Sequence, residues 1–515
     1  MSIDLELFKN YASTQTWALL APEMTLGFVA LLLLALEWVL PAERVRSLIP
    51  KIAGITLGLV FIVVATHFME LRHYAIRTLS FAELIRQTPW SELMRLFFLA
   101  SGLGVAYLSS LFFKRNHAAV TEFYALLLMT TASLMILGQS HHFIVFFVSL
   151  ETFTVGLYVM ISYLKTSEAS LEAGLKYLIL ASLGSVILLA GIVLLYGIAG
   201  NPNMPGHTAD AMNFSQLQSF IAANPDHVWV RLGAALVLGG MAFKIGALPF
   251  QIWIPDVYQG APTPVTAYLA ISSKGAGFLL LLILMNGPFL GLRTAFTPLL
   301  VLVAAGTILF GNLAAAPQKQ LKRMMGLSGI AHAGYMLMGV VASFTIEWAA
   351  GAVVFYLFTY MIASLAIFAV MIEVGGEDDA DHSVFIYEGL AERSPFLSRV
   401  LVFGVGSLAG IPPLAGFIGK FFLFLAAYRA DLLGLLAVAI FGVVVSIYYY
   451  FGWLRQGLFR SWHQILGEEA DKEELRGVFP ERPAITLPAT TRWAFIFLAG
   501  LNLVLGLYPG LLTGL

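Results

Sequence analysis

The chain has 515 residues, of which 59% are hydrophobic and only 11% charged, with a formal net charge of −1 and no cysteine. A soluble domain carries about 25% charged residues, so a chain this poor in charge needs lipid as part of its solvent. The lack of cysteine excludes disulfides, thiolate metal sites and iron–sulfur ligation, and the near-zero charge argues against a nucleic-acid partner.

Apolar stretches long enough to cross a bilayer recur along the whole chain. A hydrocarbon core of about 30 Å needs roughly 20 apolar residues in a helix. Fourteen such stretches are found, at 17–40, 49–69, 93–113, 119–138, 141–163, 171–198, 229–249, 262–286, 296–316, 322–343, 347–373, 396–428, 433–454 and 489–512. The sequence therefore predicts an all-α multi-pass membrane protein. Residues 1–16 lack the pattern of a cleaved signal peptide, so the first span is expected to stay.

The distribution of basic residues predicts the orientation. If the N-terminus is outside, the inside loops hold seventeen lysines and arginines and the outside loops eight. The positive-inside rule then places both termini outside, on the periplasmic face. Segment 71–92, with three arginines, departs from the rule, and we interpret it as an interfacial amphipathic helix built on Phe81, Leu84 and Ile85.

Large polar loops occur at 199–228, 375–395 and 456–488, and none is long enough for a catalytic domain. Any chemistry of the chain is therefore expected inside the membrane.

Two spans are interrupted by proline and glycine. The first interruption runs from Lys244 through Pro249 and Pro255 to Pro264, and the second from Gly410 to Lys420. Proline removes a helix hydrogen bond, and unpaired backbone survives in a membrane only inside protein or beside a wet cavity. A packing kink is the simpler interpretation, but each break lies close to a lysine.

The two breaks fall five spans apart, in the seventh and twelfth. Because five is odd, a duplicated five-helix unit would enter the membrane from the opposite side, and paired broken helices indicate a transport site near the midplane. We predict spans 1–3 at 1–118, a first repeat at 119–286, an inverted repeat at 296–454, and a polar loop with a last span at 455–515.

Ionisable residues inside the spans are the candidate functional residues. A charge at the bilayer centre costs about 2.5 to 3.5 kcal/mol on insertion scales, so such residues face the bundle interior. The candidates are Glu151, Lys244, Lys274, His332 and Lys420. Burial disfavours a charged lysine and a neighbouring carboxylate restores it, so a Glu–Lys pair can hold or release a proton. A structural ion pair, a snorkelling lysine, or a histidine bonded to a backbone carbonyl remain alternatives.

Lys176 is a sixth candidate for the relay, but it lies one turn after Glu172, and an interfacial i,i+4 pair explains it equally well. Glu23 is interpreted as a capping or interfacial residue, and Asp256 as a cap of a half-helix. His141 and His142 are interpreted as loop residues, because no third metal ligand is near in the sequence.

The motifs around these residues resemble the antiporter-like subunits of respiratory complex I, the type I NADH:quinone oxidoreductase. The resemblance is carried by KIGALPFQIWIPDVYQGAPTPVTA at 244–267, SLE at 149–151, LSGIAHAGY at 327–335 and GIPPLAGFIGK at 410–420. The DVYQGAPTP run and the short length are similar to the subunit N branch of bacterial enzymes. The resemblance covers most of the chain.

This resemblance implies fourteen helices with inverted five-helix repeats and proton pumping driven by distant quinone reduction. It implies that Glu151 and Lys244 form an ion pair, that Lys274 is a central relay, that Lys420 is a terminal lysine, and that His332 and Lys176 join the relay. No cofactor or metal is expected in this chain. NADH, FMN, iron–sulfur clusters and quinone are expected in partner subunits.

The resemblance also implies partners and a location. The expected partners are the lipid bilayer and other membrane subunits, especially the antiporter-like subunit M and the small subunits K and J, in the cell inner membrane. One alternative is a subunit of a cation/proton antiporter or a membrane-bound hydrogenase of the same fold. Another is a passive spacer that only transmits conformational change, but a spacer would not retain several buried charges.

Overall fold

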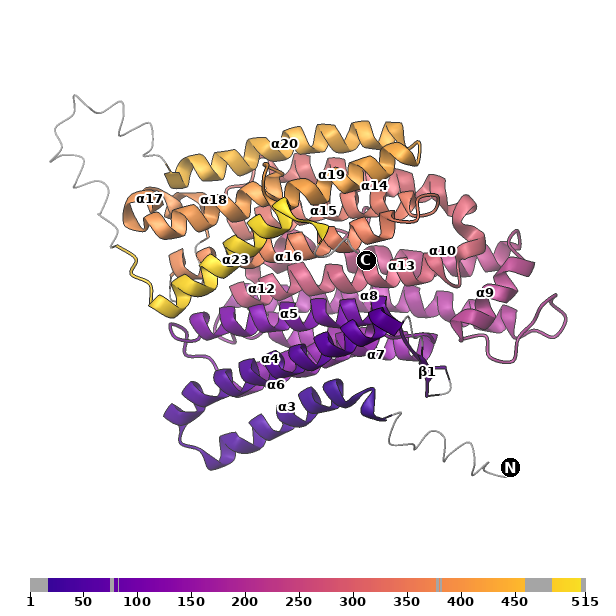
Figure 1. The fold of residues 1–515 in the computed structure, drawn as a ribbon, viewed down its shortest axis with the longest axis horizontal. Helices are drawn as coiled ribbons and strands as arrows, with labels where there is room; N and C mark the ends of the chain where they lie inside the picture. Colours follow the sequence, from indigo (N-terminus) through magenta and orange to yellow (C-terminus); the bar gives the residue numbers. More distant parts are fainter. Residues whose placement is uncertain are drawn as a thin grey trace. The chain divides into compact units, whose positions relative to one another are not determined.

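The computed structural model describes residues 17–74, 78–81, 83–376, 379, 382–458 and 484–510. Almost all of them are helical, and the helices of each unit run side by side (Figure 1). Twelve described helices are long and apolar enough to cross a membrane, and α6 (Thr121–Leu137) and α18 (Pro395–Ala409) are shorter apolar helices. The predicted all-α membrane fold is confirmed, with a helix at each of the fourteen apolar stretches.

The chain divides into two compact units. Unit 1 comprises the described residues up to Trp253 together with Gly260–Leu300. Within it α8 packs on α10, α3 on α6, and α4 on α5. Its helices are α3 (Ala21–Val39), α4 (Ala42–Tyr74), α5 (Pro89–Phe112), α6, α7 (Phe143–Ile161), α8 (Glu168–Ala199), α9 (Phe214–Ala223), α10 (Val228–Ile245), α12 (Thr263–Tyr268), the π-helix η1 (Leu269–Ser273), α13 (Lys274–Asn286) and the 3₁₀ helix η2 (Leu290–Leu292).

Unit 2 comprises Ile254–Gln259 and the described residues from Val301 onward. Within it α16 packs on α18 and α19, and α15 on α19. Its elements are α11 (Ile254–Gly260), α14 (Arg293–Ala315, which begins in unit 1), α15 (Leu321–Ala342), α16 (Ala349–Val374), η3 (Val384–Tyr387), α17 (Leu390–Arg393), α18, α19 (Ala415–Arg429), α20 (Leu433–Leu458) and α23 (Ala489–Leu507).

The prediction of an amphipathic helix within 71–92 is wrong. The segment forms an antiparallel hairpin of β1 (Thr78–Ser80) and β2 (Ile85–Gln87), with Ser80 opposite Ile85. Phe81 and Glu83 adopt positive φ values of 51° and 65° between the strands, and a helix cannot contain that conformation. Thr88 then caps α5, because its hydroxyl accepts from the Ser91 amide at 3.1 Å and the Ser91 hydroxyl accepts from the Thr88 amide at 2.8 Å.

Both predicted helix breaks are confirmed. α10 ends at Ile245 and α18 at Ala409, and each is followed by a left-handed glycine, Gly246 at φ 70° and Gly410 at φ 88°. Only glycine adopts this conformation without strain, so it is the residue that lets the chain leave the helix. The predicted span 396–428 is therefore two helices, α18 and α19. The Leu248–Pro249 and Pro412–Pro413 peptide bonds are cis.

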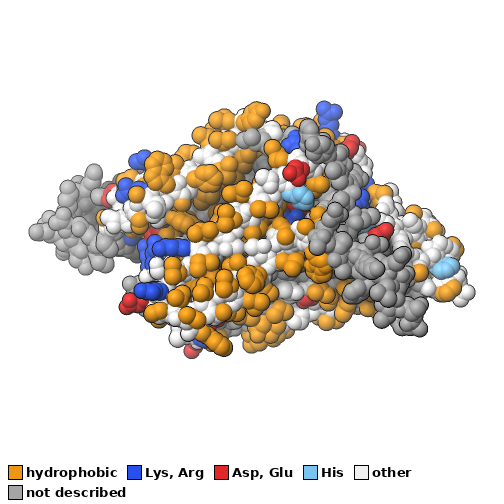
Figure 2. Space-filling model, turned by 60° about the horizontal axis from the view of Figure 1, so that its bottom comes forward, with side chains coloured by type: hydrophobic (Ala, Val, Ile, Leu, Met, Phe, Trp, Pro, Cys, Tyr) orange, Lys and Arg blue, Asp and Glu red, His pale blue; other side chains and the backbone are white. Residues whose placement is uncertain are grey.

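The outer surface is suited to lipid. Figure 2 shows a face on which hydrophobic side chains predominate and charged side chains are sparse. On α4, for example, Ile55, Leu59 and Ile62 are each at least 60% exposed. Exposed aliphatic rows of this kind are unfavourable in water and favourable against acyl chains.

Candidate functional site

The first group of buried charges lies in unit 1, between α7 and α10. Lys244, in the last turn of α10, is 4% exposed, and its Nζ lies 3.6 Å from Glu151 Oε1 on α7. The same ammonium donates a 2.7 Å hydrogen bond to Thr154 Oγ1, which lies about one turn after Glu151. The structure thus brings two predicted site residues together and adds a hydroxyl that the sequence did not reveal.

The carboxylate of this pair is partly exposed at the surface of the chain. The Glu151 side chain is 26% exposed, and Ser185 on α8 donates a 2.7 Å hydrogen bond to its Oε1. On the same helix Val148 and Val155 are more than half exposed. Glu151 therefore has a buried side facing Lys244 and an open side set among apolar residues.

Lys274 lies on α13, which packs against α10, the helix that carries Lys244. It is 3% exposed and is the first residue of α13, directly after the π-helical turn η1. Ser273 donates a 3.4 Å hydrogen bond to the Lys244 carbonyl, and a Cβ at Gly277 would lie 2.4 Å from Ile245 Cγ2. The two lysine-bearing helices are thus in close contact. Single π-helical turns are frequent at functional sites.

The second group lies in unit 2, centred on His332 of α15. Its Nδ1 lies 2.6 Å from the Tyr356 hydroxyl and its Nε2 lies 3.1 Å from the Tyr450 hydroxyl. Both ring nitrogens therefore face groups that can either donate or accept a proton. The ring is therefore bonded to two side-chain hydroxyls, and a neutral imidazole donates from one nitrogen and accepts at the other.

Lys420, on α19, reaches across the second helix break. Its Nζ donates hydrogen bonds to the carbonyls of Leu408 at 2.7 Å and Ala409 at 3.2 Å, the last two residues of α18. Carbonyls at a helix end lack intrahelical partners, which makes them suitable acceptors for a cation. The ammonium also lies 5.4 Å from the ring centroid of Tyr335, whose ring is 6.0 Å from that of His332. Tyr335 is thus a shared neighbour of the two predicted relay residues.

Buried hydroxyl groups surround this second group, and sequence reasoning missed them. Tyr335 OH accepts a 3.1 Å hydrogen bond from Asn312, and Tyr449 OH donates one at 3.2 Å to the same amide. The Tyr449 and Tyr450 rings lie 4.6 Å apart. A buried tyrosine hydroxyl needs a partner, so the recurrence of tyrosine within predicted spans, as at 356, 360, 449 and 450, was the available signal.

Lys176 forms an ion pair with Glu172 on α8. Its Nζ is 2.7 Å from Glu172 Oε1, and the two side chains are 41% and 64% exposed. The geometry matches the i,i+4 pair that was the alternative for this residue.

A third cluster of charges lies where α15 begins, and the sequence pattern did not indicate it. Asp379 bonds Lys322 Nζ at 2.7 Å and His382 Nε2 at 2.7 Å, and all three side chains are at most 5% exposed. Burial opposes ionisation of Asp379, but the charges of Lys322 and His382 outweigh it and hold the pKa of Asp379 below its usual range.

Asp256, predicted as a half-helix cap, lies in the first turn of α11 and bonds Arg323 Nη1 of α15 at 2.6 Å. This ion pair ties α11, which follows the first helix break, to the helix that carries His332. Arg323 also donates a 3.3 Å hydrogen bond to Gln259 of α11.

Glu23, interpreted as a capping or interfacial residue, lies in the first turn of α3 and is buried among other helices. Glu23 is 4% exposed, and its two oxygens accept hydrogen bonds at 2.8 Å from Arg95 and from Gln139. Arg95 also bonds both oxygens of Glu92 at 2.8 Å. Two carboxylates thus share one buried guanidinium in the N-terminal part of unit 1.

The histidine pair occupies ordinary structural positions. His142 caps α7 by accepting from the Ile144 amide at 3.1 Å, and His141 Nε2 lies 2.9 Å from Ser215 Oγ. Burial lowers the pKa of His141, with a smaller contribution from Arg86. Among the residues that the structure describes, no three His, Cys, Asp or Glu side chains are grouped to hold a metal ion.

The arrangement can hold protons on buried bases and pass them between neighbours. It contains an acid–base pair, lysines in dry surroundings, and an imidazole flanked by hydroxyls. These are the groups from which intramembrane proton relays are built.

The chain matches the family described as NADH:quinone oxidoreductase/Mrp antiporter over residues 140–446. A curated relative from Opitutus terrae, named NADH-quinone oxidoreductase subunit N 1, is 52% identical over 460 residues, covering 89% of this chain and 90% of the relative.

Solved structures show the same fold. A chain of respiratory complex I from Thermus thermophilus with bound aureothin is 29% identical, with a TM-score of 0.76 and coverage of 96% of this chain and 98% of that one. A chain of the Mrp complex from a Dietzia species is 22% identical, with a TM-score of 0.77 and coverage of 96% and 95%, a likeness that shows the fold alone.

Proposed function

This chain belongs to the NADH:quinone oxidoreductase/Mrp antiporter family, among the relatives named subunit N of NADH-quinone oxidoreductase, and from that premise we propose that it translocates protons through its buried ionisable residues. It is a membrane subunit of the translocase that oxidises NADH and reduces quinone. The antiporter alternative shares the fold but is less favoured, since the relative at 52% identity carries the subunit N name.

In unit 1 the proton carriers are Glu151, Lys244 and Lys274. When Lys244 moves toward Glu151, the carboxylate stabilises the ammonium. When it turns to the neutral hydroxyl of Thr154, the ammonium loses that support and can release its proton. The observation that carries the proposal is the Lys244 ammonium placed between these two partners, at 3.6 Å and 2.7 Å.

In unit 2 the proposed carriers are His332 and Lys420. His332 receives a proton at one ring nitrogen and gives it up at the other, with Tyr356 and Tyr450 as its neighbours. The Tyr335 ring is a neighbour of both His332 and Lys420. We assign Lys176 a secondary role, since its exposed pair with Glu172 suits a surface covered by another chain.

The two helix breaks support the proposed repeat at 119–286 and the inverted repeat at 296–454. Both follow a helix that ends at a left-handed glycine, and both lie beside a buried lysine. Residues 1–118 and 455–515 then flank the repeats, although 459–483 fall outside the described residues.

The open side of Glu151 supports a partner subunit at that face. A carboxylate that is 26% exposed among apolar residues would face lipid in an isolated chain, at a cost that a polar group of another subunit removes. We propose the antiporter-like subunit M and the small subunits K and J as neighbours. NADH, FMN, iron–sulfur clusters and quinone then belong to partner subunits, in the cell inner membrane, with both termini of this chain outside.

The test is to replace Lys244 or Glu151 by alanine in the whole complex, with Glu151→Asp as a conservative control. Assembly is verified first, and proton uptake and quinone reduction are then measured separately in proteoliposomes. We expect both alanine variants to lose most proton pumping and Glu151→Asp to retain part of it. Unchanged rates and unchanged protons per quinone in both alanine variants would refute the relay.

A further inference from the structure

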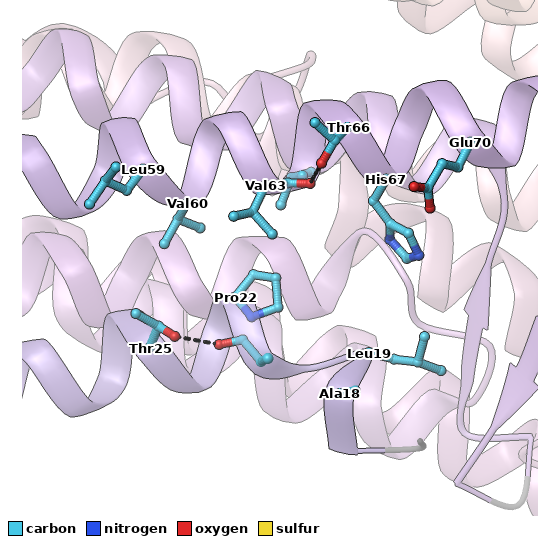
Figure 3. A pocket seen from close by; sticks show the side chains of 12 residues that line it. Ala18, Leu19, Pro22, Thr25, Leu59, Val60, Val63, Thr66, His67 and Glu70 are labelled. Atoms are coloured by element: carbon cyan, nitrogen blue, oxygen red, sulfur yellow. Dashed lines mark hydrogen bonds between the residues drawn. The ribbon is translucent and has the colours of Figure 1, made fainter. Parts of the chain in front are cut away.

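A cavity of about 520 Å³ lies between α3 and α4, far along the chain from the proposed relay residues. Figure 3 shows Pro22 and Thr25 on one wall and Leu59, Val60 and Val63 on the other. The cavity is a groove in the surface of unit 1, because Leu59 and Val63 are each more than half exposed.

The walls of this groove are effectively apolar, because the hydroxyls of its two threonines donate to backbone carbonyls. Thr25 donates its hydroxyl to the Ala21 carbonyl at 2.7 Å, and Thr66 donates to the Val63 carbonyl at 2.8 Å. Their protons are therefore used within their own helices. The rest of the groove is a strip of aliphatic surface. It lies along two membrane-spanning helices, which are surrounded by lipid.

One end of the groove is polar and carries negative charge. His67 and Glu70 lie one turn apart on α4 and both line the groove (Figure 3). Behind them Glu92 Oε2 lies 3.7 Å from His67 Nδ1, and Glu92 and Glu23 share Arg95. Glu70 is thus the carboxylate that lines the groove, and Glu92 and Glu23 lie behind it, paired with His67 and Arg95. None of the lining residues is lysine or arginine.

The polar end coincides with the end of the span. α3 begins at Ala21 and α4 ends at Tyr74, so Glu70 lies at the depth of lipid headgroups while Leu59 lies toward the middle of the membrane. A ligand for this groove needs an acyl chain at one end and a hydrogen-bonding cation at the other.

We propose that the groove is a binding site for phosphatidylethanolamine. Its ammonium donates to the Glu70 carboxylate, its phosphate accepts from the His67 ring, and one acyl chain lies along Leu59, Val60 and Val63. Phosphatidylglycerol and cardiolipin bring phosphate without a cation and meet Glu70 unfavourably, whereas the choline headgroup has no N–H to donate. The bound lipid joins α3 to α4. This inference does not depend on the proton relay.

The experiment uses the intact complex in nanodiscs, with phosphatidylethanolamine or phosphatidylglycerol carrying a photoreactive diazirine in one acyl chain. After illumination, adducts on α3 and α4 peptides are counted by mass spectrometry. We expect phosphatidylethanolamine to label the groove at least several-fold more than phosphatidylglycerol in the unaltered complex. Equal labelling by the two lipids would overturn the proposal without any variant.

Matched variants sharpen the result. Val63→Phe fills the groove and should remove most adducts, whereas Ile62→Phe, at the neighbouring residue that does not line it and is 60% exposed, should leave them unchanged. Glu70→Gln should abolish the preference for phosphatidylethanolamine. Adducts that persist in Val63→Phe would exclude the groove as their origin. A cysteine at residue 63 that crosslinks mainly to residues 1–16 would show that the chain itself fills it.

Discussion

Lys244 donates its 2.7 Å hydrogen bond to Thr154, a neutral hydroxyl nearly one turn from the carboxylate that would be its natural partner. The ammonium thus lies beside Glu151, but its Nζ is 3.6 Å from the nearest carboxylate oxygen, which is a loose ion pair. The proposed relay requires such a second position, because a lysine locked in a tight ion pair does not release its proton.

Replacing Thr154 by valine should slow proton pumping. The change keeps the shape of the side chain but removes the neutral acceptor, so Lys244 is left to pair with Glu151. Loss of one hydrogen bond to a charged group, about 1.5 kcal/mol, corresponds to roughly a tenfold slower step. Proton uptake by proteoliposomes measures it. Thr154→Ser should behave almost as the unaltered protein, and a valine variant that pumps at full rate would mean that Thr154 has no part in the transfer.

The two hydroxyls on His332 should differ in importance. Tyr356 lies closer to the ring than Tyr450, at 2.6 Å against 3.1 Å. Tyr356→Phe is therefore expected to reduce protons pumped per quinone more than Tyr450→Phe. Tyr360, whose ring lies 5.2 Å from His332, provides a control, and Tyr360→Phe should have the smallest effect. Equal losses in all three variants would point to general packing damage instead of a relay.

The second helix break should not tolerate a methyl group at Gly416. A Cβ there would lie 1.9 Å from the Ser407 carbonyl oxygen, so α19 could not stay against the end of α18. We expect Gly416→Ala to cost about 3 kcal/mol or to prevent assembly. Gly58→Ala is the control, since a Cβ there meets nothing within 4 Å. Thermal unfolding of the purified complex compares them, and equal midpoints would contradict the close contact.

The Asp379 cluster should give a pH-dependent contribution to stability. Because the charges of Lys322 and His382 hold the folded pKa of Asp379 below its usual range, the stabilisation is present above the ordinary carboxyl pKa of about 4 and is lost as pH falls below it. Asp379→Asn should therefore destabilise the protein by about 3 kcal/mol near pH 7 and by less near pH 3.5. A difference independent of pH over this range would disprove the charge-based explanation.

The helices and the candidate ionisable residues inside the spans could be predicted because both are local properties, whereas the buried clusters around Arg95 and Asp379 could not. Apolar length predicts a span, and proline with glycine predicts where it breaks. The partners could not be predicted, since Lys244 meets Thr154 from 90 residues away and His332 meets Tyr450 from 118 residues away.

The partner of Glu23 could not be predicted from the sequence either. This glutamate stands near the end of a span, where acidic residues usually face the interface. Its arginine lies 72 residues further along the chain, in a helix that the sequence alone does not place beside it. In segment 71–92 the reason is different, because three apolar residues separated by three and one positions fit a helix face and a short hairpin equally.

The π-helical turn before Lys274 sets which way that lysine points. A π-helical turn carries one residue more than an α-helical one, and each added residue advances the side chains that follow by about 100° around the axis. If η1 relaxed to α-helical hydrogen bonding, the helix that follows it, with Lys274 at its start, would turn by about 100° relative to the helix that precedes it. Residues 269–273 therefore fix how α13, and Lys274 at its start, is rotated relative to α12.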